Sequence, residues 1–433
     1  MLEWSKCLSP GGYIFPLNNG DYIYGTQTNP STGWAFVIGR ENSSGSIIWQ
    51  KTYGNNASAI FKNMMACSDG GFIMTGITNY IDTDFTTHYG SWMNEDIAII
   101  KLDSNGNKVW SKVIGGSGGE DVFSIVAAQY GGCYIIGTTS SNDYDCTGFH
   151  GGIEDLYLAR LDCNGNLLWH RDLGGSGDEG YNGHCGGGTS DGKGGVLVVC
   201  GSSSGDGDVH HSIGGYDYWV VNVDSNNNVV WENSYGGPHG HESATSICKA
   251  TDGSIWINGI SGTPSGEVDT NYGLSGAWIV HIDSAGNYLG SKVLGGKGTN
   301  WGQMICQLAG GLVMAGGYYT RNGGLFNTLD SFGNSDVFLA ILAPWNQTIV
   351  KQVSSTNSIA KIFPNPATNE VNIKMEQAGK YHLTISDVIG KIIYQANVND
   401  KVQIPVKDWV KGMFYVQVSG EDGYRSVQKL MVE

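Results

Sequence analysis

The sequence lacks long apolar runs, a helical apolar period and an excess of basic residues. No apolar run is long enough to span a bilayer, which argues against a transmembrane segment. Lysine and arginine number 24 against 40 aspartate and glutamate residues, and the formal net charge is −16. Because neutralising phosphates requires a basic face, this acidity argues against nucleic acid or an anionic membrane as a partner.

Motifs of common enzymes and of metal or disulfide frameworks are missing as well. The chain has no His-Glu-x-x-His motif and no phosphate-binding loop. Its nine cysteines form neither zinc-type pairs nor a compact disulfide framework. Cys133, Cys200, Cys248 and Cys306 lie in apolar strand runs, where we expect the thiols to pack mostly in the core.

What the chain has instead is a repeat marked by a tryptophan. Trp49, Trp110, Trp169 and Trp231 follow one another at spacings of 61, 59 and 62 residues, and Gly290 follows after 59 in a degenerate copy. A period of this size fits one supersecondary unit that needs neighbours on both sides to bury its apolar faces. The sequence therefore predicts a repeat architecture.

Each unit is predicted to contain four antiparallel strands. In the unit from Gly118 to Gly175, the strands are rich in β-branched and aromatic residues, and Gly-Gly or Asn-Gly turns supply the positive φ angles of tight hairpins. The four extended runs cover residues 122–126, 133–137, 156–162 and 167–170. Each unit is thus expected to be a four-stranded meander.

Four-stranded units in series predict an all-β fold, a β-propeller, in preference to an open solenoid. Residues 2–8 match a fourth strand without its three predecessors, and residues 336–342 match a third strand followed only by a weak fourth. The N-terminal strand is therefore expected to close the ring, giving six four-stranded blades within residues 1–350. The alternative is that Trp4 belongs to a seventh blade lost by truncation.

The composition changes near Lys351. Residues 351–360 read as a polar linker, and residues 361–433 contain short strands with alternating apolar and polar side chains. This pattern predicts a second domain, a small antiparallel β-sandwich.

Short motifs occur in a fixed order in this second domain. They are Phe363-Pro364-Asn365-Pro366-Ala367, Gly379-Lys380-Tyr381, Asp387-Val388-Ile389-Gly390-Lys391, Lys411-Gly412-Met413-Phe414-Tyr415-Val416 and Lys429-Leu430-Met431-Val432. Through them the domain resembles the type A C-terminal sorting domain of the type IX secretion system of Bacteroidetes. The alternative is a generic surface β module. The repeats are similar, more loosely, to propeller arrays in secreted proteins of those bacteria.

The resemblance implies that the type IX secretion machinery recognises this domain. It implies passage across the outer membrane, usually followed by removal of the domain, and a secreted or cell-surface location for the rest. Met1 opens directly into an expected strand, so no signal peptide is seen, and we expect the natural start to lie upstream.

Carboxylate pairs recur in the loop between the second and third strands. Two carboxylates one residue apart, with backbone carbonyls nearby, suit calcium, which makes calcium a candidate ligand. Aspartates also cap turns by accepting bonds from their own backbone, and this alternative remains open. The pairs are Asp82 and Asp84, Asp143 and Asp145, and Asp206 and Asp208.

A second polar set follows the Gly-Gly pair of each fourth strand. In a propeller this connection leads to the innermost strand of the next blade, so we expect equivalent residues to ring one mouth of the central channel and to bind a ligand. Carboxylates sharing such a mouth would repel one another unless a cation intervened. Solvated loop charges are the alternative. The set comprises Glu120, Asp121, Asp178, Glu179, His241, Glu242, Asn300 and Trp301.

Taken together, these features predict a secreted or surface binding or adhesion module. A glycan is the favoured ligand because exposed aromatic side chains beside carboxylates suit sugars, although the tryptophans that mark the repeat are expected to pack between blades. No catalytic residue is predicted. The competing classes are a polysaccharide glycosidase or lyase that uses Glu120, Glu179 and Glu242, and a structural surface-layer protein.

Overall fold

The computed structural model describes the chain in fifteen segments. They are residues 12–17, 19–28, 33–54, 59–180, 185–238, 240–262, 266–268, 274–295, 298–308, 313–319, 336–342, 360–377, 379–387, 391–420 and 425–433. All regular elements in these segments are β-strands, and none of these segments contains a helix that could cross a membrane. The chain separates into two compact units, whose described parts run from residue 12 to 342 and from 360 to 433.

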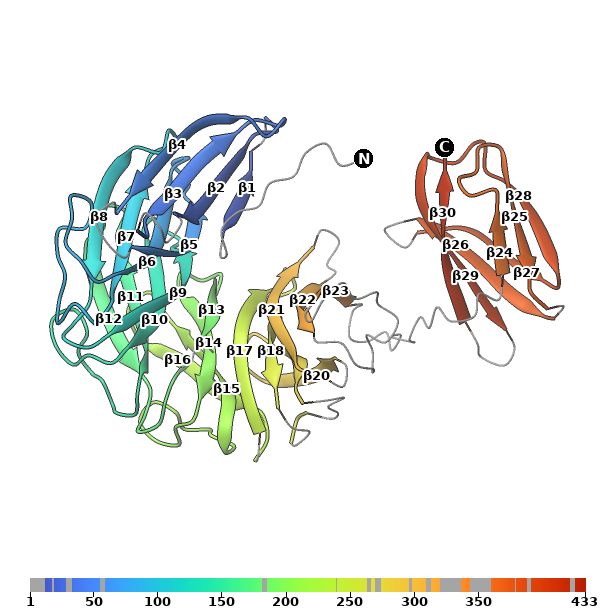
Figure 1. Cartoon of the computed structure of the whole chain (residues 1–433). Helices are drawn as coiled ribbons and strands as arrows, with labels where there is room; N and C mark the ends of the chain where they lie inside the picture. Colours follow the sequence, from blue (N-terminus) through green and yellow to red (C-terminus); the bar gives the residue numbers. More distant parts are fainter. Residues whose placement is uncertain are drawn as a thin grey trace. The chain divides into compact units, whose positions relative to one another are not determined.

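The first unit contains six antiparallel sheets in chain order (Figure 1). Sheet 1 comprises Tyr13–Pro16 (β1), Tyr22–Gln27 (β2), Phe36–Glu41 (β3) and Ile47–Tyr53 (β4). Sheet 2 comprises Ile60–Ala66 (β5), Phe72–Thr78 (β6), Asp96–Leu102 (β7) and Lys108–Ile114 (β8). Sheet 3 comprises Glu120–Ala127 (β9), Cys133–Thr139 (β10), Asp155–Leu161 (β11) and Leu167–Leu173 (β12). The strands predicted for the unit from Gly118 to Gly175 are confirmed.

The later sheets follow the same order. Sheet 4 comprises Cys185–Ser190 (β13), Val196–Ser202 (β14), Gly215–Val223 (β15) and Val229–Tyr235 (β16). Sheet 5 comprises Gly240–Lys249 (β17), Ile255–Ser261 (β18), Gly276–Ile282 (β19) and Tyr288–Leu294 (β20). Sheet 6 comprises Asn300–Gln307 (β21), Val313–Tyr319 (β22) and Asp336–Leu342 (β23). A short parallel pairing of β15 with β17 joins sheets 4 and 5.

The first strands of successive sheets contact one another, β5 with β9, β9 with β13, β13 with β17 and β17 with β21. Each sheet is therefore packed against its neighbours along the inner edge, which is a propeller-like arrangement. In the middle strands of sheets 2 and 3, β6, β7, β10 and β11, every residue is buried, because both faces of each sheet are covered. Residues 2–8, expected to close the ring, lie outside the described segments.

The tryptophans that mark the repeat pack between sheets, as predicted. A Cβ added to Gly106 would lie 2.6 Å from the Trp49 ring, and one added to Gly165 would lie 2.8 Å from the Trp110 ring. The indole N–H of Trp110 also donates to the carbonyl of Cys163 at 3.0 Å. β4 and β8 thus press their tryptophans onto the last hairpin of the next sheet, where a glycine with positive φ makes room for the ring.

A second recurrent glycine lies in the second strand of several sheets. There a bulge in the first strand pushes a carbonyl toward it, and a Cβ on Gly137 would lie 1.9 Å from the carbonyl oxygen of Asp121. The same clash recurs at Gly76 at 2.0 Å and at Gly317 at 1.9 Å. The first two strands can approach this closely only because these positions carry no side chain.

Cysteines follow the prediction in part. Cys133 and Cys200 are fully buried, whereas Cys248 and Cys306 are half-buried. Burial raises the pKa of the Cys133 thiol to about 12, so this thiol stays protonated and packs as a small apolar group.

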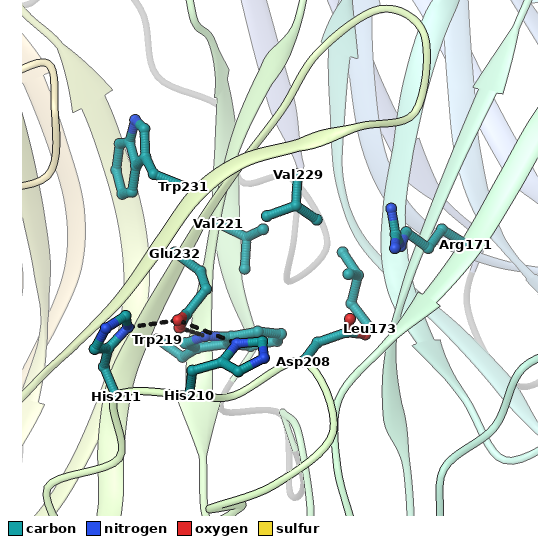
Figure 2. A pocket seen from close by; sticks show the side chains of 10 residues that line it. All are labelled: Arg171, Leu173, Asp208, His210, His211, Trp219, Val221, Val229, Trp231 and Glu232. Carbon is teal, nitrogen blue, oxygen red and sulfur yellow. Dashed lines mark hydrogen bonds and ion pairs between the residues drawn. The ribbon is translucent and has the colours of Figure 1, made fainter.

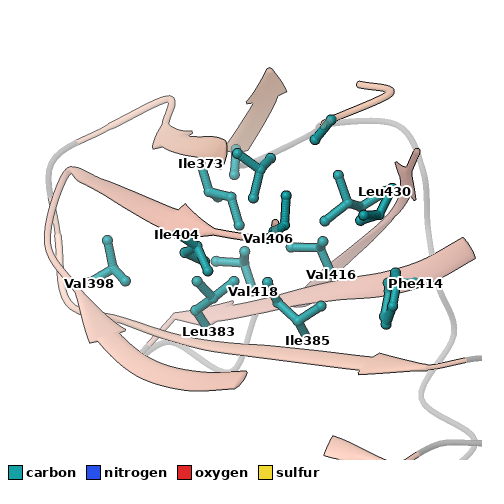
Figure 3. Packing of buried hydrophobic residues seen from close by; sticks show 14 of the residues in the cluster. Ile373, Leu383, Ile385, Val398, Ile404, Val406, Phe414, Val416, Val418 and Leu430 are labelled. Atoms are coloured by element: carbon teal, nitrogen blue, oxygen red, sulfur yellow. The ribbon is translucent and has the colours of Figure 1, made fainter. Parts of the chain in front are cut away.

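The second unit consists of two antiparallel sheets, with orders β24-β25-β28 and β27-β26-β29-β30. The strands are Ala360–Phe363 (β24), Glu370–Met375 (β25), Tyr381–Asp387 (β26), Ile392–Val398 (β27), Lys401–Pro405 (β28), Gly412–Gly420 (β29) and Arg425–Val432 (β30). Figure 3 shows Ile373 and Ile404 of one sheet packed against Leu383 and Val418 of the other. The two sheets therefore form a sandwich around one core, in agreement with the sequence pattern.

Candidate functional site

The structure corrects the interpretation of the glutamates after the Gly-Gly pairs. Glu120 is 2% exposed, and Glu179, Glu242 and Asn300 are fully buried, so none of the four can contact a large ligand. Glu120 accepts a hydrogen bond from the backbone N–H of Gly116 at 2.9 Å. Glu179 accepts from the backbone N–H of Gly175 at 3.1 Å in the same way, whereas Glu242 accepts from the Ser261 hydroxyl at 3.0 Å. Glu120 and Glu179 thus fasten the Gly-Gly turn to the sheet that follows it.

Each of these glutamates also lies next to a buried aspartate from the preceding sheet. A Cβ on Gly115 would lie 2.1 Å from Asp96 Oδ1 and 2.9 Å from Glu120 Oε2, so both carboxyl groups approach the same glycine. Asp96 Oδ1 has no donor among the described residues. Burial, with a smaller contribution from the charge of Glu120, raises the pKa of Asp96 to about 7. One proton shared between the two carboxyl groups accounts for this arrangement.

The same pairing recurs at the next two junctions. Asp155 lies beside Glu179, and Asp217 beside Glu242. Burial, then the charge of Asp217, raises the pKa of Glu242 to about 7. The carboxyl pairs, defined as Asp96–Glu120, Asp155–Glu179 and Asp217–Glu242, are therefore structural elements of the repeat.

Some exposed residues of the set predicted after the Gly-Gly pairs lie near one another in the structure. Asp121 forms an ion pair with Lys62 at 2.8 Å, and it lies near Glu95 and Glu154. Burial, with the charges of Asp121 and Asp178, raises the pKa of the Glu154 carboxyl. Glu95 and Glu154 were missed by the sequence analysis, although each directly precedes an aspartate that begins a third strand.

Aromatic side chains continue this region toward sheet 5. The Tyr216 hydroxyl donates to Asp178 Oδ2 at 3.1 Å. His241 stacks on the Tyr216 ring with centroids 4.9 Å apart, and Trp301 is 39% exposed. Asp121, Asp178, His241 and Trp301 are thus the members of the predicted set that a ligand can reach.

The paired aspartates between second and third strands fasten loops to the preceding sheet. Asp143 Oδ1 accepts from the backbone N–H of Ser117, and Asp206 Oδ1 from that of Ser176, both at 2.7 Å. No group of three His, Cys, Asp or Glu side chains in the described segments is arranged to hold a metal ion. Asp143 and Asp206 thus have backbone donors, as the turn-capping alternative expects, and calcium binding by these pairs stays a prediction.

The remaining members of these pairs have backbone or side-chain partners. Asp82 Oδ1 accepts from the N–H of Asp84 at 2.7 Å. Asp84 accepts from the Lys108 ammonium group at 2.6 Å. Asp145 accepts from the Tyr89 hydroxyl at 3.2 Å, and Asp208 is 3.4 Å from the N–H of Gly174. All three pairs act as loop anchors.

A cleft of about 400 Å³ opens between sheets 3 and 4 (Figure 2). Leu173, Val221 and Val229 give it an apolar floor. Charged and imidazole side chains surround this floor, and one of them, Glu232, is a nearly buried carboxylate with a side chain that is 7% exposed. The sequence analysis did not find this cleft.

Hydrogen bonds fix Glu232 at the edge of the cleft. Its Oε2 accepts from the indole N–H of Trp219 at 2.8 Å, and its Oε1 lies 2.5 Å from His211 Nδ1. His210 Nδ1 is 3.5 Å from the same oxygen. Figure 2 shows both imidazole rings beside this carboxylate, with Arg171 on the opposite wall.

The residues of the expected sorting signal lie at the ends of strands in the second unit. The side-chain amide of Asn365 donates to the carbonyl of Lys429 at 2.7 Å, and Asn365 Oδ1 accepts from the N–H of Met431 at 2.8 Å. Phe363 ends β24 and Pro364 and Pro366 flank Asn365. Gly412 begins β29, and the N–H of Lys391 donates to Asp387 at 2.9 Å. Gly390 lies outside the described residues.

Residues 361–433 match the family described as the secretion system C-terminal sorting domain. The second unit is a type IX sorting domain. The sorting domain implies export by the type IX secretion machinery and a secreted or cell-surface location. No curated protein sequence matches the chain.

Solved structures with a similar arrangement of strands come from several bacteria. The extracellular domain of a putative one-component system from B. thetaiotaomicron shares 10% identity at a TM-score of 0.34, over 98% of this chain and 58% of that one. A gluconolactonase from Xanthomonas campestris shares 12% at a TM-score of 0.36, over 75% and 83% of the two chains. An aldose sugar dehydrogenase from Streptomyces coelicolor shares 11% at 0.36, over 76% and 94%. The chain spans less than two thirds of the first of these proteins.

Proposed function

We propose that the first unit is an extracellular carbohydrate-binding module that the sorting domain exports. Its domain limits are taken as residues 1–350, with a linker at 351–360 and the sorting domain at 361–433. The observation that carries the proposal is a group of exposed apolar side chains in the loop between β6 and β7. Trp92 is 67% exposed, Met93 71%, Ile81 60% and Tyr80 50%.

The loop that carries these side chains is held in place. The side-chain amide of Asn79 donates to the carbonyl of Trp92 at 3.0 Å, and that of Asn94 to the carbonyl of Ser117 at 2.7 Å. His88 Nδ1 lies 2.7 Å from the buried Asp96. An anchored loop that exposes aromatic rings to water is typical of a contact surface rather than of a solvated connection.

The class of ligand follows from the rings and the charge. Aromatic faces with carboxylates nearby suit the apolar face and the hydroxyl groups of a sugar ring. The net charge of −16 disfavours a polyanionic glycan, so a neutral polysaccharide is proposed. The competing glycosidase or lyase is not favoured, since the three glutamates it would use are buried and bonded within the fold.

Replacing Trp92 with alanine should weaken retention on a neutral polysaccharide by about tenfold or more, because a stacked aromatic ring contributes roughly 1.5 kcal/mol or more. Retention of the full chain on a panel of insoluble polysaccharides measures this. Tyr130→Ala is the matched control: this ring is 83% exposed but lies in the hairpin between β9 and β10, at the opposite end of the strands. Equal losses in both variants, or no retention of the parent chain, would contradict the proposal.

We also propose that residues 2–8 complete sheet 6 as its fourth strand and close a ring of six blades. Removing residues 1–8 should then lower the unfolding temperature of the full chain by several degrees, because an edge of sheet 6 is left unpaired. Differential scanning calorimetry of the full chain and of the variant without residues 1–8 tests whether the ring is closed in this way. An unchanged unfolding profile would favour the alternative in which Trp4 belongs to a further, truncated blade.

A further inference from the structure

The cleft between sheets 3 and 4 contains a carboxylate that the repeat does not require. Glu232 follows the marker tryptophan of β16, and the residues in the same place in β8 and β20 are Ser111 and Ser291. Both serines simply donate to a loop carbonyl of their own sheet, Ser291 to Glu267 at 2.8 Å. Burying a carboxylate costs free energy unless the carboxylate is paired with a charge or hydrogen-bonded. At the four other equivalent places, which carry Gln50, Ser111, His170 and Ser291, the repeat is built without a carboxylate.

The tryptophan that bonds to Glu232 also indicates that the repeat does not require this carboxylate. Trp219 and Trp278 occupy equivalent positions in the third strands of sheets 4 and 5, and both are fully buried. The indole N–H of Trp219 donates to Glu232, whereas that of Trp278 has no acceptor among the described residues. Among the described residues, therefore, this tryptophan has a carboxylate partner in sheet 4 and none in sheet 5.

The loop above the cleft is specialised as well. His210 and His211 stand side by side, and their side chains are 69% and 61% exposed. The equivalent residues of sheet 3 are Thr147 and Gly148. A fixed acid, two accessible imidazoles and Arg171 thus surround an apolar floor at one junction.

We propose that this cleft is a second ligand site, which binds a single neutral sugar ring. The assignment of a sugar rests on the carbohydrate function proposed above, whereas the site is distinct from the exposed loop between β6 and β7. A pyranose ring offers C–H groups to the apolar floor of Leu173 and Val229. Its hydroxyl groups both donate and accept, which matches a rim of carboxylates, imidazoles and a guanidinium group.

The charged and polar side chains of the rim also disfavour anionic and apolar small ligands. Asp208 and Glu232 face one guanidinium group, that of Arg171, which already donates to the carbonyl of Asn227 at 2.9 Å. A phosphate or carboxylate ligand would meet two like charges there. An apolar ligand would leave the acids and imidazoles of the rim without hydrogen bonds.

The test is a titration of the full chain with glucose, galactose, mannose, N-acetylglucosamine and, for comparison, glucuronate, followed by ligand-observed NMR. At least one neutral sugar should bind, and more tightly than glucuronate. His210→Ala should weaken it by about tenfold or more without affecting folding, since this side chain is mostly exposed. Glu232→Gln should act in the same direction. Ser291→Ala, at the equivalent place in sheet 5, is the control that should not change binding.

Three outcomes would overturn the inference. They are binding of no neutral sugar, tighter binding of glucuronate, and equal binding in the His210→Ala variant and the parent chain. Retention of the same proteins on polysaccharide, with Trp92→Ala in parallel, judges the proposed function separately. Loss of sugar binding in His210→Ala with polysaccharide retention intact would support two separate sites.

Discussion

The first unit should resist urea better at pH 5 than at pH 8. The cause is the set of buried acids, whose pKa values are raised in the folded chain to about 7 for Asp96 and Glu242 and to about 8 for Asp172. In the unfolded chain such groups titrate near pH 4. Between about pH 4 and pH 8 the folded chain therefore holds protons that the unfolded chain has released, and stability falls as pH rises through this window.

Each unit of pKa difference corresponds to about 1.4 kcal/mol, so several such acids together should lower the free energy of unfolding by several kcal/mol between pH 5 and pH 8. Exposed aspartates with lowered pKa values have the opposite effect on the pH dependence of stability. Side-chain and backbone donors of Asn107 lower the pKa of Asp103, and its stabilising effect is lost only as pH falls below about 4. The optimum is thus expected near pH 5.

Asp172 offers the sharpest test among these acids. It is 3% exposed, and neither of its carboxylate oxygens has a donor within the part of the chain that the structure describes. His170 Nδ1 lies 4.0 Å away, and burial lowers the pKa of that imidazole, which disfavours the charged form that could pair with Asp172. Asp172→Asn should stabilise the chain at pH 8 and have little effect at pH 5.

Tryptophan fluorescence is a suitable probe, because 12 of the 13 tryptophans precede residue 351. Urea midpoints at pH 5 and pH 8 would be compared for the parent chain, Asp172→Asn and Asp103→Asn. The last variant replaces an exposed hairpin carboxylate and should give no gain at pH 8. Equal midpoints of the parent chain at the two pH values would exclude shared protons in the carboxyl pairs.

Replacing Gly137 with alanine should destabilise the first unit by more than about 3 kcal/mol. The new Cβ would lie 1.9 Å from a backbone carbonyl oxygen, and neither atom can move without breaking the pairing of β9 with β10. Since the total stability of a domain is only about 5–15 kcal/mol, much of the protein is expected to be insoluble.

Gly119→Ala is the matched control for this substitution. The nearest atom to a Cβ there is 4.0 Å away, so the cost should stay within about 0.5 kcal/mol. Soluble yield and urea unfolding compare the two variants. A Gly137→Ala protein as stable as the control would show that the bulge relaxes, and that the glycine is not needed for the close approach of the strands.

The strands and their order could be predicted because they depend on local features. Alternating or β-branched runs and Asn-Gly turns mark the ends of β10, β11 and β12, and the tryptophan spacing marks the repeat. Closure was inferred from residues 2–8, and the sequence alone does not separate it from a truncated seventh blade. The sorting domain was predictable because its motifs are specific.

The candidate site was harder to predict because adjacent strand residues point to opposite faces. Glu120 and Asp121 are neighbours, yet one is buried and the other reaches solvent. The signal was available: Glu120 is two residues from the buried Val122 and therefore shares its face. Aligning the fourth strands would also have revealed Glu232 as the one carboxylate in a position that otherwise carries Gln50, Ser111, His170 and Ser291, which is the departure that marks the cleft.

The tryptophan contacts between sheets run in one direction along the chain. Every fourth strand from β4 to β16 supplies an indole to the following hairpin, but β20 has Gly290 at this place. Sheet 6 thus receives no such ring from sheet 5, and its amides should exchange with deuterium sooner than those of sheets 2 to 5. Local opening of the array is expected to begin at this end, and to proceed backward one sheet at a time.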